Sequence, residues 1–335
     1  MTIKDIARLS GVGVSTVSRV LNNHPDVSEK SRRRVLEVIA THNYLPNNSA
    51  RDLVRTKSDA IGLVVRGLQN PFYTGIIRAI EHELDEAGFT MVMRQISSCD
   101  DEIKCGALME REKRLRGIIF LGGRSDYTPE ELALVNVPFV CCSYTNSYGT
   151  LDPASYCSVS IADEQEAYRA VMELYKSGHT RIAALTADPD DRSISQLRYC
   201  GYARALREIG QTHEDVIRAE DFTIESGYRA MQRRLEQPAD FTALFAIADD
   251  MAIGAMRALR ESGRSVPEDC SVIAIDGIAV SEYIHPMLTT LCQPTEEMGR
   301  RSVELLLDVI RGGVQKHVTL PTTLRAGQSV RAVQK

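Results

Sequence analysis

The sequence lacks tryptophan, has only 6% aromatic residues, and contains no apolar run of the roughly 18 to 20 residues that a membrane span needs. Its N-terminus has no apolar segment typical of signal peptides. The eight cysteines form no Cys-x-x-Cys pair and have no histidine at zinc-binding spacing. We therefore expect reduced thiols, no metal, no other cofactor, no membrane association and a cytoplasmic location.

Enzyme motifs are also missing. No Gly-x-Gly-x-x-Gly follows a strand pattern, and the P-loop, zinc-protease and nucleophile-elbow motifs do not occur. His179 follows Gly178 at the end of a helical pattern, where an imidazole can satisfy backbone carbonyls without a role in catalysis. We predict that the protein is not an enzyme.

The composition that remains is ordinary for a folded protein, but its charge is unevenly distributed. The 335 residues are 43% hydrophobic and 25% charged, enough for two or three units with their own cores. Residues 1–58 hold ten Lys/Arg and five Asp/Glu, a net charge of +5, whereas the remainder holds 30 basic and 40 acidic residues, a net charge of −10. A basic head on an acidic body indicates that the head binds a polyanion.

Three short helices are predicted in the head. The pattern Thr2-x-x-Asp5 is typical of a capping box, so a helix should start near Ile3 and end at Gly11-Val12-Gly13. A second helix runs through Ser15 to Leu21, and a third runs from an N-cap at Ser28 to about Thr41. The side chains expected to face inward in the third helix are Val35, Leu36, Val38 and Ile39. This arrangement predicts a helix-turn-helix domain over residues 1–45.

A linker is predicted next, over residues 46–59. Pro46 ends the helical pattern, and residues 49–55 could form one or two helical turns under suitable conditions. From residue 60 onward, apolar runs alternate with helical periods, which predicts an α/β body of two doubly wound parallel-sheet lobes. Expected strands are 60–65, 90–96, 117–121, 139–143, 182–186, 243–248 and 271–275; expected helices include 73–87, 163–177, 196–209, 225–236, 251–262 and 295–310.

The head resembles the DNA-binding domain of the lactose-repressor/galactose-repressor family of bacterial transcription regulators. The motifs that carry the resemblance are Thr2-Ile3-Lys4-Asp5-Ile6-Ala7, Gly11-Val12, Ser15 to Asn22, Val27-Ser28, Asn43-Tyr44-x-Pro46-Asn47 and Ala50-Arg51-x-Leu53. The resemblance implies that the second helix enters the major groove, and the residue types suit contacts to base edges and phosphates. The DNA-binding residues it implies are Thr2, Val14, Ser15, Thr16, Ser18, Arg19, Asn22, Tyr44, Asn47, Ala50 and Leu53.

Two positions in this region stand out. The resemblance implies that Leu53 wedges into the minor groove from a hinge helix that forms on the operator, bending the DNA at a cost in base stacking. Gly13 lies where family members usually have a serine cap, so the recognition helix should have a cap made by backbone alone, at a cost of a few tenths of a kcal/mol.

The body resembles the rest of the same family, whose core is similar to periplasmic sugar-binding proteins. Matching motifs include Asn70-Pro71-Phe72-Tyr73, Arg198-x-x-Gly201-Tyr202, Asp249 to Ala255 and Pro286-x-Leu288-Thr289-Thr290. The resemblance implies a ligand cleft and three crossovers between lobes, near 160–163, 291–294 and 320–323. Lobe 1 is then about 60–160 with 292–321, and lobe 2 about 163–290 with 322–335.

Candidate effector-binding residues follow from the carboxyl ends of the strands, where open α/β sheets bind ligands. Carboxylates, a guanidinium and aromatic rings suit a polyhydroxylated ligand. An alternative for Asp249 and Asp276 is that each caps the helix after its strand. The candidates, some from the residues and some from the resemblance, are Phe72, Tyr73, Arg192, Arg198, Phe222, Asp249 and Asp276.

These observations predict a DNA-binding transcription regulator, most simply a repressor, controlled by a small effector in the cleft. A sugar or sugar phosphate is the first expectation, although Ala248 replaces an asparagine common in sugar-responsive relatives. A purine is the alternative, because the sequence around Phe222 resembles the purine-responsive branch. A free-standing solute-binding protein would need export and no basic head. We expect a homodimer on double-stranded operator DNA, and no tetramer, since no leucine heptad occurs near the C-terminus.

Overall fold

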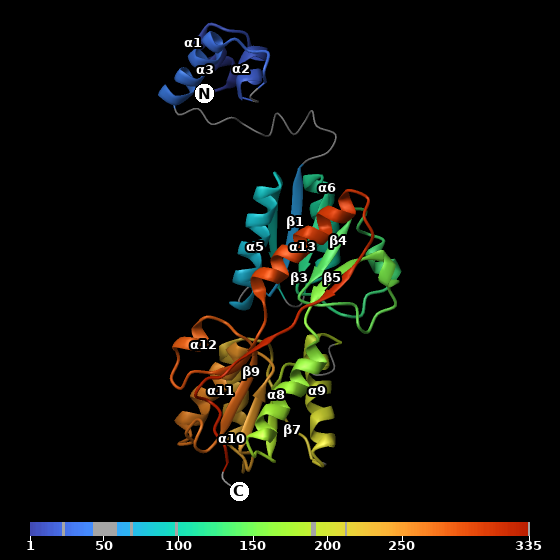
Figure 1. Cartoon of the computed structure of the whole chain (residues 1–335), viewed down its shortest axis with the longest axis vertical. Coiled ribbons are helices and arrows are strands. Elements are labelled where there is room, and N and C mark those ends of the chain that lie inside the picture. The colour runs from blue at the N-terminus through green and yellow to red at the C-terminus, as the bar shows by residue number, and fades with distance from the viewer. Residues whose placement is uncertain are drawn as a thin grey trace. The chain divides into compact units, whose positions relative to one another are not determined.

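The computed structural model describes residues 1–21, 24–42, 59–67, 70–97, 100–188, 192–211 and 213–333. The chain divides into two units, residues 1–58 and 59–335 (Figure 1). Five of the predicted DNA-binding residues lie outside the described residues, as does the predicted linker up to residue 58: Asn22, Tyr44, Asn47, Ala50 and Leu53. None of the helices in the described ranges is long and apolar enough to cross a membrane.

The head contains three helices around a small core. Helix α1 (Ile3–Ser10) begins with the predicted capping box, in which Thr2 and Asp5 exchange hydrogen bonds, and it ends at Gly11 with a φ of 63°. Helix α2 (Val14–Leu21) follows after two residues, and helix α3 (Glu29–Thr41) begins at the predicted cap Ser28. The core consists of Ile6, Ala7, Val17, Val20, Val27 and Val35.

One predicted core position of α3 is wrong. Leu36 is 49% exposed, whereas Val35 is fully buried and Val38 and Ile39 pack partly against the core. Residues 35, 38 and 39 lie on one face because a helix repeats every 3.6 residues. Position 36 is turned about 100° away from residue 35, so its side chain faces outward.

Lobe 1 is built on a parallel sheet of six strands in the order β11-β5-β4-β3-β1-β2. Its core joins strand residues to helices α5 and α13, which pack against each other (Figure 1). The elements are β1 (Ala60–Arg66), α5 (Phe72–Glu86), β2 (Thr90–Ile96), α6 (Glu102–Lys113), β3 (Gly117–Leu121), α7 (Pro129–Leu132), β4 (Phe139–Cys142), the 3-10 helix Pro153–Ser155, β5 (Cys157–Ser160), α13 (Thr295–Ile310) and β11 (His317–Thr319).

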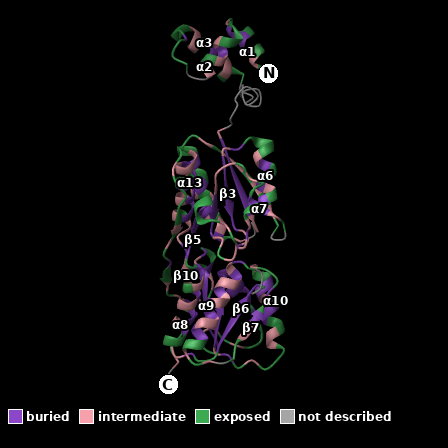
Figure 2. Ribbon diagram, turned by 90° about the vertical axis from the view of Figure 1, so that its right-hand side faces the viewer, coloured by how far each residue is buried: buried purple, intermediate pink, exposed green. Residues whose placement is uncertain are grey.

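Lobe 2 has a second six-stranded sheet in the order β12-β10-β9-β8-β6-β7, parallel except for the antiparallel pair β10–β12. Its strands are largely buried beneath the helices (Figure 2). The elements are α8 (Asp163–Lys176), β6 (Ile182–Thr186), α9 (Ile194–Glu208), β7 (Asp215–Arg218), α10 (Ile224–Leu235), β8 (Ala243–Ala246), α11 (Asp249–Glu261), β9 (Ser271–Asp276), α12 (Val280–Tyr283), β10 (Thr289–Cys292) and β12 (Thr323–Arg325).

The chain passes between the two sheets three times. It leaves the sheet of lobe 1 after β5 and returns from the sheet of lobe 2 after β10. It then crosses again between β11 and β12 (Figure 1). Because both sheets take strands from distant parts of the sequence, neither lobe is a continuous segment. This arrangement confirms the predicted class of fold, a helical head followed by two doubly wound lobes.

Two glycines of the family-like motifs lie where helices cross closely. A Cβ at Gly254 of α11 would lie 2.0 Å from the Ile224 carbonyl oxygen of α10. A Cβ at Gly201 of α9 would lie 2.1 Å from the Glu164 carbonyl oxygen of α8. The glycines allow these helix pairs to pack backbone against backbone, which keeps the helices flanking the sheet of lobe 2 close together.

Candidate operator interface and effector cleft

The second helix of the helix-turn-helix presents the predicted base-reading side chains to solvent. Val14, Ser15 and Arg19 are exposed, whereas Val17 and Val20 on the opposite face are buried in the head core. Thr16 and Ser18 are half-buried beside them. Helix α2 therefore has one face for the core and one polar face with a guanidinium, as a helix that enters the major groove requires.

In the helix-turn-helix, α2 begins at a backbone cap and α1 begins at a side-chain cap. The Gly13 carbonyl accepts hydrogen bonds from the amides of Thr16 and Val17, at 2.9 and 3.1 Å, so α2 begins on a backbone carbonyl at the glycine. At α1, the Thr2 hydroxyl donates to the Asp5 carboxylate at 2.8 Å and accepts from the Asp5 amide. Thr2 thus holds the first turn of α1 while remaining exposed.

A cleft of about 710 Å³ lies between the two lobes, within the range of ligand sites, roughly 300–1,000 Å³. Its lining comes from the loops that follow the strands of both sheets, as expected for open parallel sheets. Lobe 1 contributes Arg66, Gly67, Asn70, Tyr73, Gln95, Ile96, Ser97, Asp100, Gly122, Gly123, Ser143 and Tyr144. Lobe 2 contributes Ala187, Asp188, Ser193, Ile194, Glu220, Asp221, Phe222 and Thr223.

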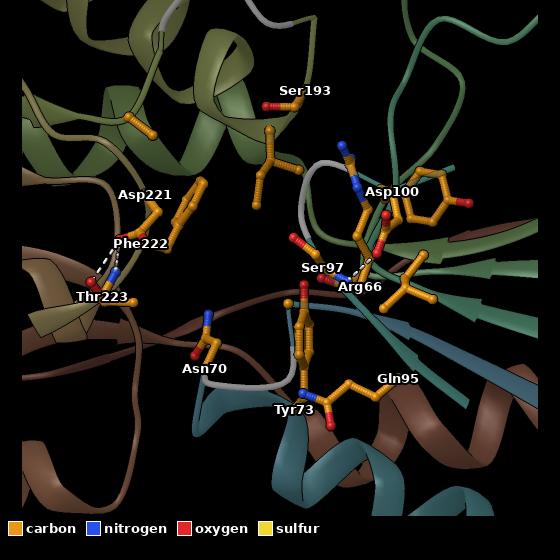
Figure 3. A pocket seen from close by; sticks show the side chains of 18 of the residues that line it. Arg66, Asn70, Tyr73, Gln95, Ser97, Asp100, Ser193, Asp221, Phe222 and Thr223 are labelled. Atoms are coloured by element: carbon orange, nitrogen blue, oxygen red, sulfur yellow. Dashed lines mark hydrogen bonds between the residues drawn. The ribbon is translucent and has the colours of Figure 1, made fainter. Parts of the chain in front are cut away.

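Two of the predicted effector residues face each other across this cleft. Tyr73 extends from the first turn of α5 in lobe 1, and Phe222 points inward from the loop before α10 in lobe 2 (Figure 3). Burial raises the pKa of the Tyr73 phenol, and the nearby carboxylate of Asp276 raises it further, so the phenol stays protonated. The cleft therefore combines aromatic surface with a hydroxyl that can donate and accept hydrogen bonds.

Arg198 and Asp276 are brought together in lobe 2, but they do not line the cleft. Arg198 Nε donates to Asp163 Oδ1 at 2.8 Å, while Nη1 lies 3.4 Å from Asp276 Oδ1 and also donates to the Ile247 carbonyl. Gln293 donates to the same Asp276 oxygen at 2.8 Å. Arg198 is 2% exposed and Asp276 is 4% exposed. Burial raises the pKa of both carboxyls, and the Arg198 charge lowers it. The three charges form a buried cluster that joins α8, α9 and β9.

Asp249, a predicted effector residue, is not part of the cleft lining. This side chain is fully buried at the start of α11 and does not cap its own helix, whose first residue it is. Its Oδ2 accepts from the amides of Gly277 and Ile278, both at 3.0 Å, and from the Ser281 hydroxyl at 2.8 Å. Its Oδ1 accepts from the Thr290 hydroxyl at 2.5 Å. Asp249 therefore fixes the turn after β9, and its lone pairs are engaged by protein donors.

Two further candidates are also displaced from the cleft lining. Phe72 is buried in the core of lobe 1, because it begins α5 on the side that packs against the sheet. Arg192 is exposed with a φ of 47°, and its carbonyl accepts from the Ser125 amide of lobe 1 at 3.1 Å. Arg192 thus contributes a backbone contact between the lobes.

Strained backbone occurs at the ends of two strands near the cleft. Ser143 has a φ of 70° directly after β4 and lines the cleft, and Asp276 has a φ of 138° at the end of β9. Non-glycine residues adopt such conformations at a cost, and they concentrate at ligand sites. Both strained residues therefore lie at the carboxyl ends of strands, where the cleft is also found.

Sequence reasoning missed most of the polar residues of lobe 1 that line the cleft. Arg66 ends β1, Asn70 precedes α5, and Gln95, Ser97 and Asp100 lie around the end of β2. Their position at the carboxyl ends of strands is the signal in the sequence that could have found them, as it does for Phe72 and Tyr73 after β1. Within the described ranges, no group of three or more His, Cys, Asp or Glu side chains could hold a metal ion.

A helix-turn-helix with an exposed polar face and a two-lobed body with a ligand-sized cleft define a regulator of transcription. Residues 2–47 match the bacterial regulatory proteins of the lacI family, and residues 171–330 match the periplasmic binding protein-like domain. The chain is 38% identical to the HTH-type transcriptional regulator MalR of Clostridium butyricum over 328 residues, 97% of each protein. It therefore belongs to the LacI family of DNA-binding transcriptional regulators.

Solved structures agree with this assignment. The chain resembles the lac repressor dimer bound to operator and the anti-inducer ONPF, with a TM-score of 0.81, 26% identity and 99% of each chain covered. It also resembles the transcriptional regulator CelR in complex with cellobiose, with a TM-score of 0.71 and 32% identity. That second comparison covers 98% of this chain and 99% of the CelR chain.

Proposed function

We propose that the protein is a repressor that binds a pseudo-palindromic operator as a homodimer, with an operator affinity controlled by a saccharide in the cleft between its lobes. The observation that carries the proposal is the cleft, which takes its lining from both lobes and holds an aromatic side chain from each. Sugar sites typically pair an aromatic ring face with polar groups around the rim. The similarity to a regulator solved with cellobiose supports the same ligand class.

Control of operator affinity follows from the position of the ligand. A molecule that contacts Tyr73 of lobe 1 and Phe222 of lobe 2 binds best at one separation of the lobes. It therefore shifts the population of closure states by its difference in affinity for them. Residue 60 begins β1 of lobe 1 directly after the linker, so a change in lobe 1 reaches the head through covalent connection.

A purine is the second candidate, and Phe222 is the observation that favours it. Its ring points into the cleft, where it could stack on a base as well as on a sugar ring (Figure 3). A thermal-shift panel of sugars, sugar phosphates and purines distinguishes these classes, because a ligand that binds the native state raises its melting temperature.

The homodimer is supported by exposed apolar side chains on α12. Tyr283 is 84% exposed and Val280 is 44% exposed, although both are large and apolar. The lac repressor neighbour was solved as a dimer on its operator, and two heads are needed for useful specificity on a pseudo-palindrome. Light scattering of the purified protein is expected to give twice the chain mass of 37.2 kDa. A mass of one chain at micromolar concentration would contradict the dimer.

Replacing Phe222 with alanine is expected to weaken saccharide binding by about tenfold, a loss of about 1.4 kcal/mol, because the sugar loses the apolar ring surface that it would cover. Operator affinity without ligand should stay unchanged, since Phe222 lies in the body. Calorimetric titration with the sugar that gives the largest thermal shift measures the first effect, and fluorescence anisotropy of labelled operator measures the second. Phe222→Tyr is the matched control, which keeps the ring and should retain most of the affinity. Equal sugar affinity for Phe222→Ala and the parent would remove Phe222 from the site.

A further inference from the structure

We infer that the effector is an uncharged saccharide of at least two rings, and that the cleft rejects phosphorylated sugars. This inference rests on the proposed function and narrows its ligand class. Three features of the cleft support it: the charge of the lining residues, the hydrogen bonds that cap the helix N-termini at the cleft, and the volume of the cleft.

The positive charge in the cleft is already paired. Among the described residues that line the cleft, Arg66 is the one cationic side chain. Its Nε lies 3.6 Å from Oε2 of Glu102, a carboxylate that is buried behind the cleft wall. The other oxygen of Glu102 accepts from the Arg124 amide at 2.9 Å. A ligand phosphate would therefore have to compete with a fixed internal anion for Arg66.

The rest of the charged lining is acidic and comes from both lobes. Asp100 lies on the lobe 1 side, and Asp188, Glu220 and Asp221 lie on the lobe 2 side, all four exposed. A cleft lined by one sign of charge concentrates its field inside the cleft and repels ligands of the same sign. Sugar hydroxyls, by contrast, can donate charge-assisted hydrogen bonds to these carboxylates.

The helix N-termini at the cleft do not offer a free phosphate cradle. Helix N-termini attract anions because their first amides lack partners. At α10, however, Asp221 Oδ1 accepts from the amide and hydroxyl of Thr223, at 3.0 and 2.6 Å. The Thr223 hydroxyl in turn accepts from the Ser226 amide at 3.1 Å. The protein thus supplies its own carboxylate at this helix end (Figure 3).

Two further helices that start at the cleft, α5 and α9, are capped in a similar way. At α5, Asn70 Oδ1 accepts from the Phe72 amide at 2.9 Å, and the Asn70 carbonyl accepts from the Tyr73 amide at 3.1 Å. At α9, the Ser193 hydroxyl accepts from the Ser195 amide at 3.1 Å. These caps occupy donors that a phosphate group would otherwise use.

The size of the cleft favours more than one sugar ring. Its volume of about 710 Å³ lies in the upper half of the usual range, roughly 300–1,000 Å³, and exceeds what a single hexose fills. Tyr73 and Phe222 provide ring surfaces on opposite lobes. A ligand of two or more rings can contact both surfaces at once and so connect the lobes.

The test uses the full-length protein and matched pairs of sugars: glucose, maltose, cellobiose and trehalose, each beside its 6-phosphate. Thermal shift identifies which members bind, and calorimetry measures their dissociation constants. We expect at least one neutral disaccharide to bind, with its phosphorylated partner at least about tenfold weaker and glucose weaker than the disaccharide. Affinity for the neutral sugar should change little between low and high salt.

A charge variant tests the cause of the discrimination. In Asp100→Asn/Asp221→Asn, each side-chain oxygen that accepts a backbone amide is kept while two negative charges are removed. In this variant, the ratio of the dissociation constants of the phosphorylated and the neutral sugar should fall by about threefold or more. The matched control is Glu86→Gln/Glu268→Gln, which removes two exposed charges outside the cleft lining. This control should leave the ratio of the two dissociation constants unchanged.

The outcomes separate this inference from the proposed function. A phosphorylated sugar that binds as tightly as its neutral partner, or more tightly, overturns the inference and leaves saccharide control intact. Binding of glucose alone overturns the size argument. If no saccharide binds in either form and a purine does, the saccharide function and this inference fail together.

Discussion

Replacing Arg198 with alanine is expected to lower the free energy of unfolding of the body by about 3–5 kcal/mol, the usual cost of leaving a buried charge unpaired. The substitution removes the guanidinium that lies between Asp163 and Asp276 and also donates to the Ile247 carbonyl. Two buried carboxylates would then lose their main compensating charge. Urea denaturation followed by circular dichroism measures the loss.

The pH dependence of this loss distinguishes stranded charges from simple loss of packing. Burial already raises the pKa of Asp163 and Asp276 in the folded protein, and Arg198 opposes that rise. Without Arg198, both folded pKa values rise further above the unfolded value of about 3.9. The folded variant then takes up protons as the pH falls, so its deficit relative to the parent should be largest above neutral pH and should shrink towards pH 5.

A matched control lies on the same helix. Arg207 is exposed on α9, so Arg207→Ala removes the same charge and similar side-chain volume at the surface. Its effect should stay within about 0.5 kcal/mol, as for most surface substitutions. If Arg198→Ala costs no more than Arg207→Ala, or if its deficit is independent of pH, the buried charge cluster does not stabilise lobe 2 as described.

The second large effect is expected at Arg19 in the recognition helix. Arg19→Ala should weaken binding to the specific operator by at least about 30-fold, since a bidentate base contact contributes about 1–3 kcal/mol and a dimer loses it twice. The side chain is exposed on α2, so the fold of the head should be unaffected. Anisotropy titration with the tightest-binding duplex selected from a random pool measures the change.

Arg33→Ala is the matched control for this loss. Arg33 is exposed on α3, so the variant has the same net charge as Arg19→Ala but keeps the surface of α2. Both variants should lose a similar amount of affinity for random DNA, because non-specific binding depends on the number of positive charges that contact phosphates. Only Arg19→Ala should lower the ratio of specific to non-specific affinity. Equal ratios for the two variants would mean that Arg19 contacts phosphates and does not read bases.

The head was predictable from sequence because its elements are local. The capping box at Thr2, the end of α1 at Gly11 and the cap at Ser28 each depend on residues within a few positions of one another. The exposure of Leu36 was missed because adjacent apolar residues were assigned to one face, although helical geometry separates them.

In the body, long apolar strands were predicted and short polar ones were not. Strand β7 carries Asp215 and Arg218, and β11 and β12 are three-residue edge strands with exposed polar side chains. Such segments have no apolar run, and pairing to a neighbouring strand alone makes them strands. The general class of fold did not depend on them.

The two candidates that line the cleft were predicted on different grounds. Tyr73 follows from its position after the predicted strand at 60–65, whereas Phe222 comes after β7, which was not predicted, and was a candidate only through the family resemblance. Asp249 also follows a predicted strand, but its partners lie 28 to 41 residues further along the chain, at Gly277, Ile278, Ser281 and Thr290. Sequence spacing contains no information about such distant donors, so a buried structural carboxylate could not be told from a ligand-binding one.

A saccharide in the cleft is expected to control operator affinity. The most direct measurement is an anisotropy titration of the selected operator duplex with full-length protein, in the absence and in the presence of saturating neutral disaccharide. We expect the operator dissociation constant to change by about tenfold or more, within the usual range of allosteric coupling, and Phe222→Ala to need more sugar for the same change. An operator dissociation constant that stays the same while calorimetry shows saturating sugar binding would mean that the saccharide does not control operator affinity.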